Sequence, residues 1–544
     1  MEKIFFGGTI RTMDTSNPVV EAVLVEDDKI VAVGSYEDMV AQAGSDVEQV
    51  DLEGNAMLPG LFEPHAHFDL ASFMHKGNFI GGLVYDNADE VVAKMKEAAE
   101  KTPKGKWLFL FGLDYLINRD LPELDRHWLD ENVSTEHPIM VCVQSMHTSI
   151  VNTLALETMG IDRNTPDARD GRIYHDEDGE PNGILTEQTL TYPFLLAWIN
   201  DWKLNPAELM KEQFIEWKKK GITSTWTAGM QSMFPNQLAL MNQWEQAAPL
   251  RQDYAIAFAP LESGAASLDD CPEDNPMFKF TGIKFWYDGS PYTGNMFMYD
   301  NYLENEIMQD RLKIPAHQAG ERLFDQEYFY NMFKKYHDMG FQISVHSQGD
   351  RSSHELLDIM ERVITESPRT DHRHRIEHCA FMTQEDIQRC ADLGITLSYH
   401  VGHLFYYGEA LNELVIGEDR MNSMFMRCRD ALDKGIKISL HSDDPMYFAD
   451  PLMLVATACS RTSRKGNRMT TDQAITVDEA MRAVTIDAAW QQKRENEVGS
   501  IEVGKYADFT ILSEDPYEVE DPYNIKDIDV VTTYLAGIDT DTMY

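Results

Sequence analysis

Histidines and one aspartate stand at the ends of β-like apolar runs, where their side chains could bind a metal ion. His65 and His67 lie two residues apart in LFEPHAH, so on a strand both point to one face, with about 6.6 Å between their α-carbons. His346 ends the run GFQISVH, His378 ends HRIEH, and Asp443 follows GIKISLHS. Neutral imidazole and carboxylate suit Zn, Fe, Mn or Co. The pattern predicts a divalent metal site.

Lys284 lies in the middle of the apolar run GIKFWYD, where an unpaired ammonium group would be costly to bury. It could pair with Asp288 or extend to the surface. Alternatively, CO2 could carboxylate the amine, and the resulting carbamate would bridge two metal ions. We favour carboxylation, so the chemical state of Lys284 decides between one metal ion and two.

Most of the 17 histidines in the chain must be ordinary core or surface residues. We expect no metal binding from those in predicted loops or helices or off the predicted strand face, namely His75, His127, His137, His317, His354, His372, His374 and His441. His147, His400 and His403 are intermediate cases.

Eight apolar runs recur along the chain, and most follow a helix-like stretch that ends in glycine. The runs are AMLPGLFEPHAH, GITSTWTAG, YAIAFAP, GIKFWYDGS, GFQISVHSQGD, HRIEHCAF, GITLSYH and GIKISLHSDD. This alternation predicts an α/β fold with a TIM-type (β/α)8 barrel over residues 58–496. The C-terminal ends of barrel strands converge on one face, which would bring the metal-binding side chains together.

The strand count also predicts what surrounds the barrel. Residues from about 69 to 205 must form a large insert after the first barrel strand, with PIMVCVQS as one of its strands. Both ends of the chain, residues 1–57 and 497–544, read as short strands separated by turns. We therefore expect a small β-sandwich domain built from the two termini.

Charge and cysteine content restrict the class of protein. The 47 Lys and Arg residues against 91 Asp and Glu give a net charge of −44, which would repel nucleic acid and anionic lipid. We find no run of about 18 apolar residues that would predict a membrane span. The six cysteines form no CxxC pair, and the first residues lack the apolar core of a signal peptide. We expect a cytoplasmic protein without nucleic-acid or membrane partners.

Taken together, several stretches resemble the amidohydrolase superfamily, in the amidohydrolase family 3 branch that includes N-substituted formamide deformylases. They span nearly the whole chain and are LPGLFEPHAHF, HTSIVNTLALETMGI, GRIYHDEDGEPNGILTE, GITSTWTAG, GIKFWYDGS, ISVHSQGDRSSHELLDIME, HRIEHCAFMTQEDI, LHSDDP and GSIEVGKYADFTIL. The resemblance implies a terminal β-sandwich, a distorted (β/α)8 barrel and a site for one or two divalent metal ions. Zinc is the first expectation, with Fe, Mn or Co as alternatives.

The resemblance also assigns roles to residues. By motif, His65 and His67 match the two ligands of strand one, and Lys284 matches the lysine of strand four. His346, His378 and Asp443 match the ligands of strands five, six and eight, respectively. Three departures bear on the substrate rather than on the metal site. Glu63 stands where aspartate is commoner, and His400 stands where many relatives have glutamine. The stretch SPYTGNMFMYD replaces a segment of small residues that is more typical of the family.

The activity implied is hydrolysis of a C–N bond in a small amide, N-acyl, N-formyl or cyclic amide substrate. A bound divalent ion lowers the pKa of water and makes hydroxide available at neutral pH. We expect Asp443 to take the proton and deliver it to the leaving nitrogen, while His147 or His400 helps the metal to stabilise the oxyanion. The segments FWYDGSPYTGNMFMYDNY and HLFYYGEAL would line the pocket mouth, which favours a partly apolar or aromatic substrate.

Other reactions of the superfamily use the same ligands, among them deamination, hydration or dehydration, and decarboxylation. A non-catalytic scaffold would be expected to lose ligands, whereas all six positions are intact here. We expect an enzyme with a small-molecule substrate that forms a homodimer.

Overall fold

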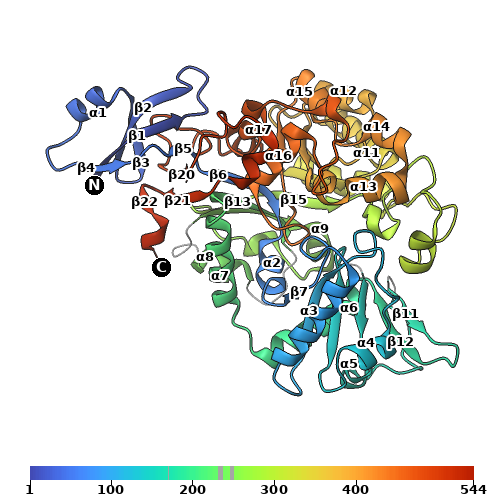
Figure 1. Cartoon of the computed structure of the whole chain (residues 1–544). Helices are drawn as coiled ribbons and strands as arrows, with labels where there is room; N and C mark the ends of the chain where they lie inside the picture. Colours follow the sequence, from blue (N-terminus) through green and yellow to red (C-terminus); the bar gives the residue numbers. More distant parts are fainter. Residues whose placement is uncertain (147, 169–170, 231–236, 245–249, 544) are drawn as a thin grey trace.

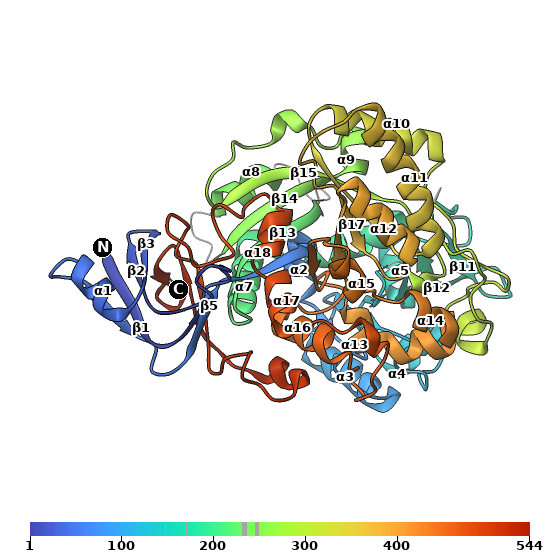
Figure 2. The same ribbon diagram turned by 90° about the horizontal axis from the view of Figure 1, so that it is seen from above.

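The computed structural model describes residues 1–146, 148–168, 171–230, 237–244 and 250–543 and arranges them around three β-sheets. In Figure 1 the sheet of the two termini lies at the left, the barrel occupies the centre and upper right, and the insert lies below the barrel. Figure 2 shows the same arrangement from above.

Eight parallel strands form the barrel and neighbour one another in the order of the sequence. They are β6 (Leu61–Ala66), β13 (Ile222–Met230), β14 (Arg251–Ala257), β15 (Phe278–Trp286), β16 (Gln342–Ser347), β17 (Arg375–His378), β18 (Thr396–Tyr399) and β19 (Ile438–Leu440). Every residue of β6, β13 and β14 is buried. Strands that are covered on both faces have continuous apolar sequences. The eight apolar runs of the sequence correspond to these eight barrel strands, so the predicted strands are confirmed.

Helices precede the later strands and cover the outside of the barrel. These are α7 (Pro206–Lys218) before β13, α10 (Gln326–Asp338) before β16, α11 (Asp350–Glu366) before β17, α12 (Gln384–Leu393) before β18 and α15 (Cys428–Asp433) before β19. The Asp325 side chain caps α10 by accepting from two backbone N–H groups, and Gly394 ends α12 with a left-handed φ of 70°. The predicted helix-like stretches before these strands are therefore confirmed.

Further helices follow the strands or complete the ring. They are α8 (Gln237–Trp244), α9 (Phe258–Ser263), α13 (Gly402–Ala410), α14 (Glu418–Met424), α16 (Pro451–Ser460), α17 (Val477–Ala483) and α18 (Ile486–Gln491). A long connection from β15 to α10 contains the 3-10 turn η3 (Pro291–Thr293) and the π-helix η4 (Ile307–Arg311). No described helix has the length and apolar character that a membrane crossing requires.

The insert after β6 has a six-stranded sheet of its own. Its strands are β7 (Asn78–Phe79), β8 (Leu108–Leu113), β9 (Ile139–Val143), β10 (Thr148–Val151), β11 (Ile173–His175) and β12 (Pro181–Thr186). The helices of this region are α2 (Phe68–Met74), α3 (Ala88–Lys101), α4 (Arg126–Asn132), α5 (Thr153–Met159) and α6 (Gln188–Trp202). The predicted insert strand PIMVCVQS contains β9.

Both termini contribute to one eight-stranded sheet. Its strands are β1 (Glu2–Arg11), β2 (Val19–Glu26), β3 (Lys29–Gly34), β4 (Glu48–Asp51), β5 (Ala56–Pro59), β20 (Phe509–Leu512), β21 (Val530–Leu535) and β22 (Ile538–Asp539), with α1 (Tyr36–Gln42) beside them. β5 pairs with β20, and the Phe5 ring packs 5.1 Å from Phe509 and 4.9 Å from Tyr534. The strands of the N-terminal part therefore pack on those of the C-terminal part, as the sandwich prediction requires.

Candidate metal centre

Asp443, His65 of β6 and His67 directly after β6 form the first cluster of the site. Asp443 Oδ1 lies 3.3 Å from His65 Nε2 and 3.2 Å from His67 Nε2. The backbone fixes this arrangement, because the N–H of Asp443 donates to the His65 carbonyl (3.1 Å) and the N–H of His67 donates to the Asp444 carbonyl (2.7 Å). These bonds join the ends of β6 and β19, the first and last barrel strands.

The ends of the middle strands complete the cluster. The second carboxylate oxygen of Asp443 lies 3.9 Å from His378 Nδ1 and 4.0 Å from His400 Nδ1. The His346 ring is centred 4.3 Å from the His378 ring. The structure thus brings the predicted histidines and Asp443 together at the C-terminal ends of the barrel strands.

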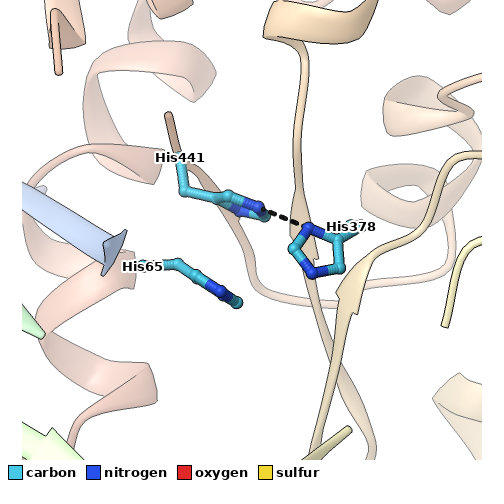
Figure 3. Close-up of side chains that lie close together, drawn as sticks. All are labelled: His65, His378 and His441. Atoms are coloured by element: carbon cyan, nitrogen blue, oxygen red, sulfur yellow. Dashed lines mark hydrogen bonds between the residues drawn. The ribbon is translucent and has the colours of Figure 1, made fainter. Parts of the chain in front are cut away.

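His441 belongs to this cluster as well, although no metal binding was expected from it. Its ring stacks on His65 at 4.5 Å, and its Nε2 lies 3.1 Å from His378 Nδ1 (Figure 3). Ring nitrogens of His65, His378 and His441 all come within 4.8 Å of one another. His441 follows the last residue of β19, where the alternation of strand side chains no longer fixes their direction.

Lys284 is fully buried and faces the cluster. Its Nζ lies 3.2 Å from His65 Nε2 and 5.1 Å from the centre of the Trp286 ring. Burial lowers the pKa of the Lys284 amine to about 8. Asp288 accepts hydrogen bonds from the backbone N–H groups of Phe297, Gln348 and Gly349, and no described carboxylate lies within ion-pair distance of Lys284. Neither a pair with Asp288 nor exposure at the surface therefore explains this lysine.

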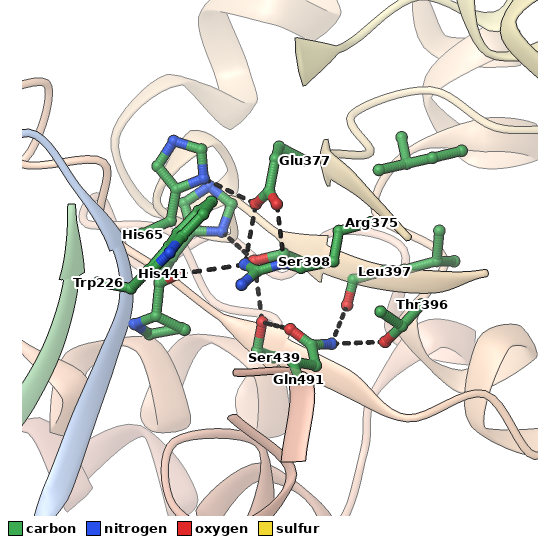
Figure 4. Close-up of polar contacts among 12 residues, drawn as sticks. His65, Trp226, Arg375, Glu377, Thr396, Leu397, Ser398, Ser439, His441 and Gln491 are labelled. Atoms are coloured by element: carbon green, nitrogen blue, oxygen red, sulfur yellow. Dashed lines mark hydrogen bonds and ion pairs between the residues drawn. The ribbon is translucent and has the colours of Figure 1, made fainter. Parts of the chain in front are cut away.

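A buried ion pair supports His65 from behind (Figure 4). Glu377 Oε2 lies 2.7 Å from His65 Nδ1, and the Arg375 guanidinium lies 2.8 Å from Glu377 and stacks 4.4 Å from the Trp226 ring. Burial alone would raise the pKa of Glu377, but Arg375 and then His65 outweigh it and lower the pKa to about 2. The carboxylate therefore stays ionised and accepts the N–H of His65 Nδ1, which leaves the Nε2 lone pair directed at the cluster.

A chain of hydrogen bonds sets the tautomer of His378. Gln491 donates through its amide nitrogen to Thr396 and Leu397, so its oxygen must accept the Ser439 hydroxyl proton at 2.6 Å. The single proton of the Ser439 hydroxyl is used in that bond, so we infer that the proton in the 2.9 Å contact between Ser439 and Ser398 comes from Ser398. Ser398 then accepts from His441 Nδ1 at 2.8 Å. The unprotonated His441 Nε2 accepts from His378 Nδ1, so the lone pair of His378 lies on Nε2 (Figure 3). His441 therefore orients a ligand.

The same reasoning applies to His346 and His400. His346 Nε2 donates to the Gly289 carbonyl at 3.3 Å, which leaves the lone pair on Nδ1. His400 Nε2 donates to the Ser442 carbonyl at 2.8 Å, so its Nδ1 also carries a lone pair. Burial lowers the pKa of His346 to about 3 and that of His400 to about 4, so both rings are neutral. A neutral His400 has no N–H toward Asp443, which argues against its predicted role as an oxyanion donor and favours a ligand role.

These donors suit a divalent cation. Asp443 Oδ1 and His400 Nδ1 are buried and have no hydrogen-bond partner among the described residues, an arrangement that is costly unless a ligand binds there. Burial would raise the pKa of Asp443, but His65 and His67 hold it well below its usual value. An ionised carboxylate surrounded by neutral imidazole lone pairs is a donor set that binds Zn and similar ions.

A cavity of about 700 Å³ opens above the cluster. His67, His346, His378, His400 and Asp443 line its floor, and its walls include Phe258, Trp286, Tyr292 and Phe324. Trp286 and Tyr292 come from the first aromatic segment that was predicted to line the pocket, and His403 comes from the second. Other aromatic residues of these segments, such as Phe285 and Tyr407, are buried in the hydrophobic core instead.

A hydrogen-bonded group of two tyrosines and a histidine lies at the side of this cavity. His403 Nε2 donates to Gln348 Oε1 at 3.0 Å, so its Nδ1 must accept a proton. The hydroxyls of Tyr292 and Tyr447 lie 2.6 and 2.7 Å from that nitrogen and 2.9 Å from each other. One tyrosine donates to His403 and the other donates to the first, which fixes the position of Tyr292 in the cavity wall. His147, predicted as a substrate contact, lies outside the described residues.

Comparisons with known proteins agree with this geometry. The model of the amidohydrolase family matches residues 48–538. N-substituted formamide deformylase of Arthrobacter pascens is 26% identical over 98% of this chain and 97% of its own length, and putative amidohydrolase YtcJ of Bacillus subtilis is 26% identical over 99% of both. An uncharacterized metal-dependent hydrolase from Pyrococcus horikoshii has the same fold, with a TM-score of 0.72 at 22% identity over 96% of this chain and 99% of that one. The chain thus belongs to the amidohydrolase family and is a metal-dependent hydrolase.

Proposed function

We propose that this enzyme hydrolyses the C–N bond of a small amide, N-acyl, N-formyl or cyclic amide compound that is partly apolar or aromatic. The observation that carries the proposal is the set of imidazole lone pairs and the Asp443 carboxylate that face one cavity with aromatic walls. The formamide deformylase similar to this chain over nearly its whole length supports an N-formyl or related substrate.

The metal-binding residues in this proposal are His65, His67, His346, His378 and Asp443, with His400 as a further donor. A bound divalent ion would supply Lewis-acid activation of water and of the substrate carbonyl. Zinc is the proposed metal, and elemental analysis of the purified protein tests that choice. A homodimeric state also stays a prediction, to be tested by mass in solution.

Lys284 is proposed to be carboxylated and to bridge two ions. Its free amine attacks the carbon of CO2 and loses a proton, which gives the carbamate. With a pKa of about 8, about a tenth of the amine is unprotonated at pH 7, far more than for an exposed lysine. The 3.2 Å distance from Lys284 Nζ to His65 Nε2 supports this proposal, because a carbamate on that nitrogen would lie close to a proposed metal ligand.

Asp443 is proposed to move the proton in the reaction. Its depressed pKa keeps it ionised at neutral pH, so it can accept a proton from the attacking water and pass it to the leaving nitrogen. Phe258, Trp286 and Phe324 would contact the apolar part of the substrate in the cavity wall.

A substrate screen tests the proposal. The metal-loaded protein is incubated with N-formyl, N-acyl and cyclic amides of aromatic amines, and the products are identified by mass. Hydrolysis adds one water and releases an amine or opens a ring, whereas decarboxylation loses CO2 and deamination releases ammonia. Turnover of none of the amides, with turnover of an amino-purine or a carboxylic acid instead, would assign a different reaction to this site.

A further inference from the structure

A second cavity of about 480 Å³ adjoins the metal cavity. It lies between the insert and the connection from β15 to α10. The two cavities share the lining residues Ser145, Glu187, Tyr292, Asn295 and Glu321. A molecule whose scissile bond lies at the metal centre can therefore extend past Tyr292 into this second chamber.

Three cationic side chains line the second chamber beside the carboxylates of Asp114, Glu123, Glu187 and Glu321. Arg172, Arg311 and Lys313 line it, although the whole chain carries a net charge of −44. Lys313 pairs with Glu123 at 2.7 Å, and Arg172 lies 3.7 Å from Asp167. Arg311 is half-buried and has no side-chain hydrogen bond or ion pair with any residue that the structure describes.

No carboxylate of the chamber forms an ion pair with Arg311 among the residues that the structure describes. Glu123 is paired with Lys313, and the buried Asp114 accepts hydrogen bonds from Tyr407 and from the N–H groups of Leu116 and Ile117. Glu187 and Glu321 lie at the boundary with the metal cavity, because they line both. Along the path from the metal centre, negative side chains therefore come first and Arg311 comes after them.

The backbone that carries Arg311 is unusual and firmly anchored. Arg311 ends the π-helix η4, and Lys313 two residues later has a left-handed φ of 58°. Met308 of η4 is fully buried, and the Asn305 side chain before it donates to the Leu414 carbonyl at 2.8 Å. Single π-helical turns and left-handed non-glycine residues are costly and occur frequently at functional sites.

We propose that Arg311 binds a carboxylate at the far end of the substrate, so that the preferred substrates are long amides with a terminal carboxylate. The guanidinium presents paired N–H groups that match a carboxylate. Glu321, at the boundary of the two cavities, repels the same carboxylate when the substrate is too short to carry it past that point. The proposal deepens the proposed amide hydrolysis and rests on it for its kinetic part.

The kinetic test uses N-formyl-ω-amino acids of increasing chain length, each beside its uncharged methyl ester. For long chains we expect the acid to exceed the ester in kcat/KM by about tenfold or more, the effect of one charge-assisted hydrogen bond. For the shortest chains the ester should be preferred. Arg311→Gln should abolish the preference for long acids, Arg311→Lys should retain part of it, and Arg119→Gln should retain all of it. Arg119 is the matched control, because it pairs with Glu413 and lines neither cavity.

A binding test separates this proposal from the proposed reaction. Titration calorimetry measures the affinity of decanoate and of 1-decanol for the metal-free protein, its Arg311→Gln variant and its Arg119→Gln variant. Decanoate binding that depends on Arg311 supports the anion site even when no formamide is hydrolysed. Two results would overturn the anion site alone. The first is hydrolysis of neutral amides together with equal decanoate binding by the wild type and the Arg311→Gln variant. The second is a preference for acids that this variant keeps at every chain length.

Discussion

Replacement of Glu377 by glutamine tests how the buried ion pair supports the metal centre. The variant keeps the shape of the side chain and an oxygen that can accept from His65 Nδ1, but it removes the negative charge between His65 and Arg375. Both Glu377 and Arg375 are fully buried. Two separate effects follow, one on metal affinity and one on stability.

The size of each effect can be worked from the structure. Glu377 has a pKa of about 2 instead of 4.5, so its ionised form is favoured by roughly 3 kcal/mol in its buried site. Loss of that charge leaves the Arg375 guanidinium buried and unpaired, which costs about 3–5 kcal/mol of unfolding free energy. A weaker hydrogen bond to His65 should lower metal affinity by about 10–100-fold.

The double variant Glu377→Gln/Arg375→Met is the matched control. It removes both charges, so most of the lost stability should return, whereas metal affinity should stay low because His65 still lacks its ionised acceptor. Urea unfolding of the metal-free proteins measures stability, and competition with a chelator measures metal affinity. Because the pKa of Glu377 is depressed in the folded state, its contribution is present above pH 4.5 and is lost as the pH falls from 4.5 toward 2. Wild-type metal affinity in the single variant, or equal stability of the single and double variants, would refute the reasoning.

Three further predictions concern single residues. Asp443→Asn should retain metal but lower turnover by about 10²–10⁴-fold, since it cannot accept the proton; near-normal turnover with any amide contradicts the proton role. His441→Ala should lower the metal content after dialysis, because the His378 tautomer loses its acceptor, and unchanged content would reduce His441 to a packing residue. Burial raises the pKa of Asp114 to about 6, so the protonated form of this residue favours the folded state. Its contribution to the free energy of unfolding is complete below pH 3.8 and is lost as the pH rises toward 6. Asp114→Asn should therefore gain stability relative to the wild type over that interval, by up to roughly 3 kcal/mol, and parallel pH profiles of the two urea midpoints would exclude this.

The barrel could be predicted from the sequence because its strands are buried on both faces and end in polar residues. Such strands read as separate apolar runs, and their number and order give the topology. The pairing of His65 with His67 was predicted from the two-residue period of a strand, and the two rings do lie close together, although β6 ends at Ala66 and His67 follows it. The positions of His346, His378 and Asp443 followed from the rule that strand ends share one face of a barrel.

The direction of side chains beyond the strand ends could not be predicted in this way. His378 has a φ of 75° and Asp443 a φ of 59°, both in the left-handed region. A residue in this conformation turns the chain, so the alternation that holds along a strand does not continue past it. His441 directly follows the last residue of β19, where the alternation along the strand no longer fixes the direction of a side chain, so its place beside His65 and His378 could not be predicted from the strand pattern.

The supporting ion pair was missed although the sequence held a signal for it. Lys284 drew attention because a charged group in a buried run needs a partner or a chemical function. The same argument applies to Arg375 and Glu377, which lie two residues apart in the run HRIEHCAF. Their spacing alone would predict that these two residues pair with each other. The structure adds that Glu377 of β17 also forms a hydrogen bond with His65 of β6. Charges in buried strands therefore identify both the residues that face the metal and the residues that orient them, and contacts between distant strands are needed to tell the two apart.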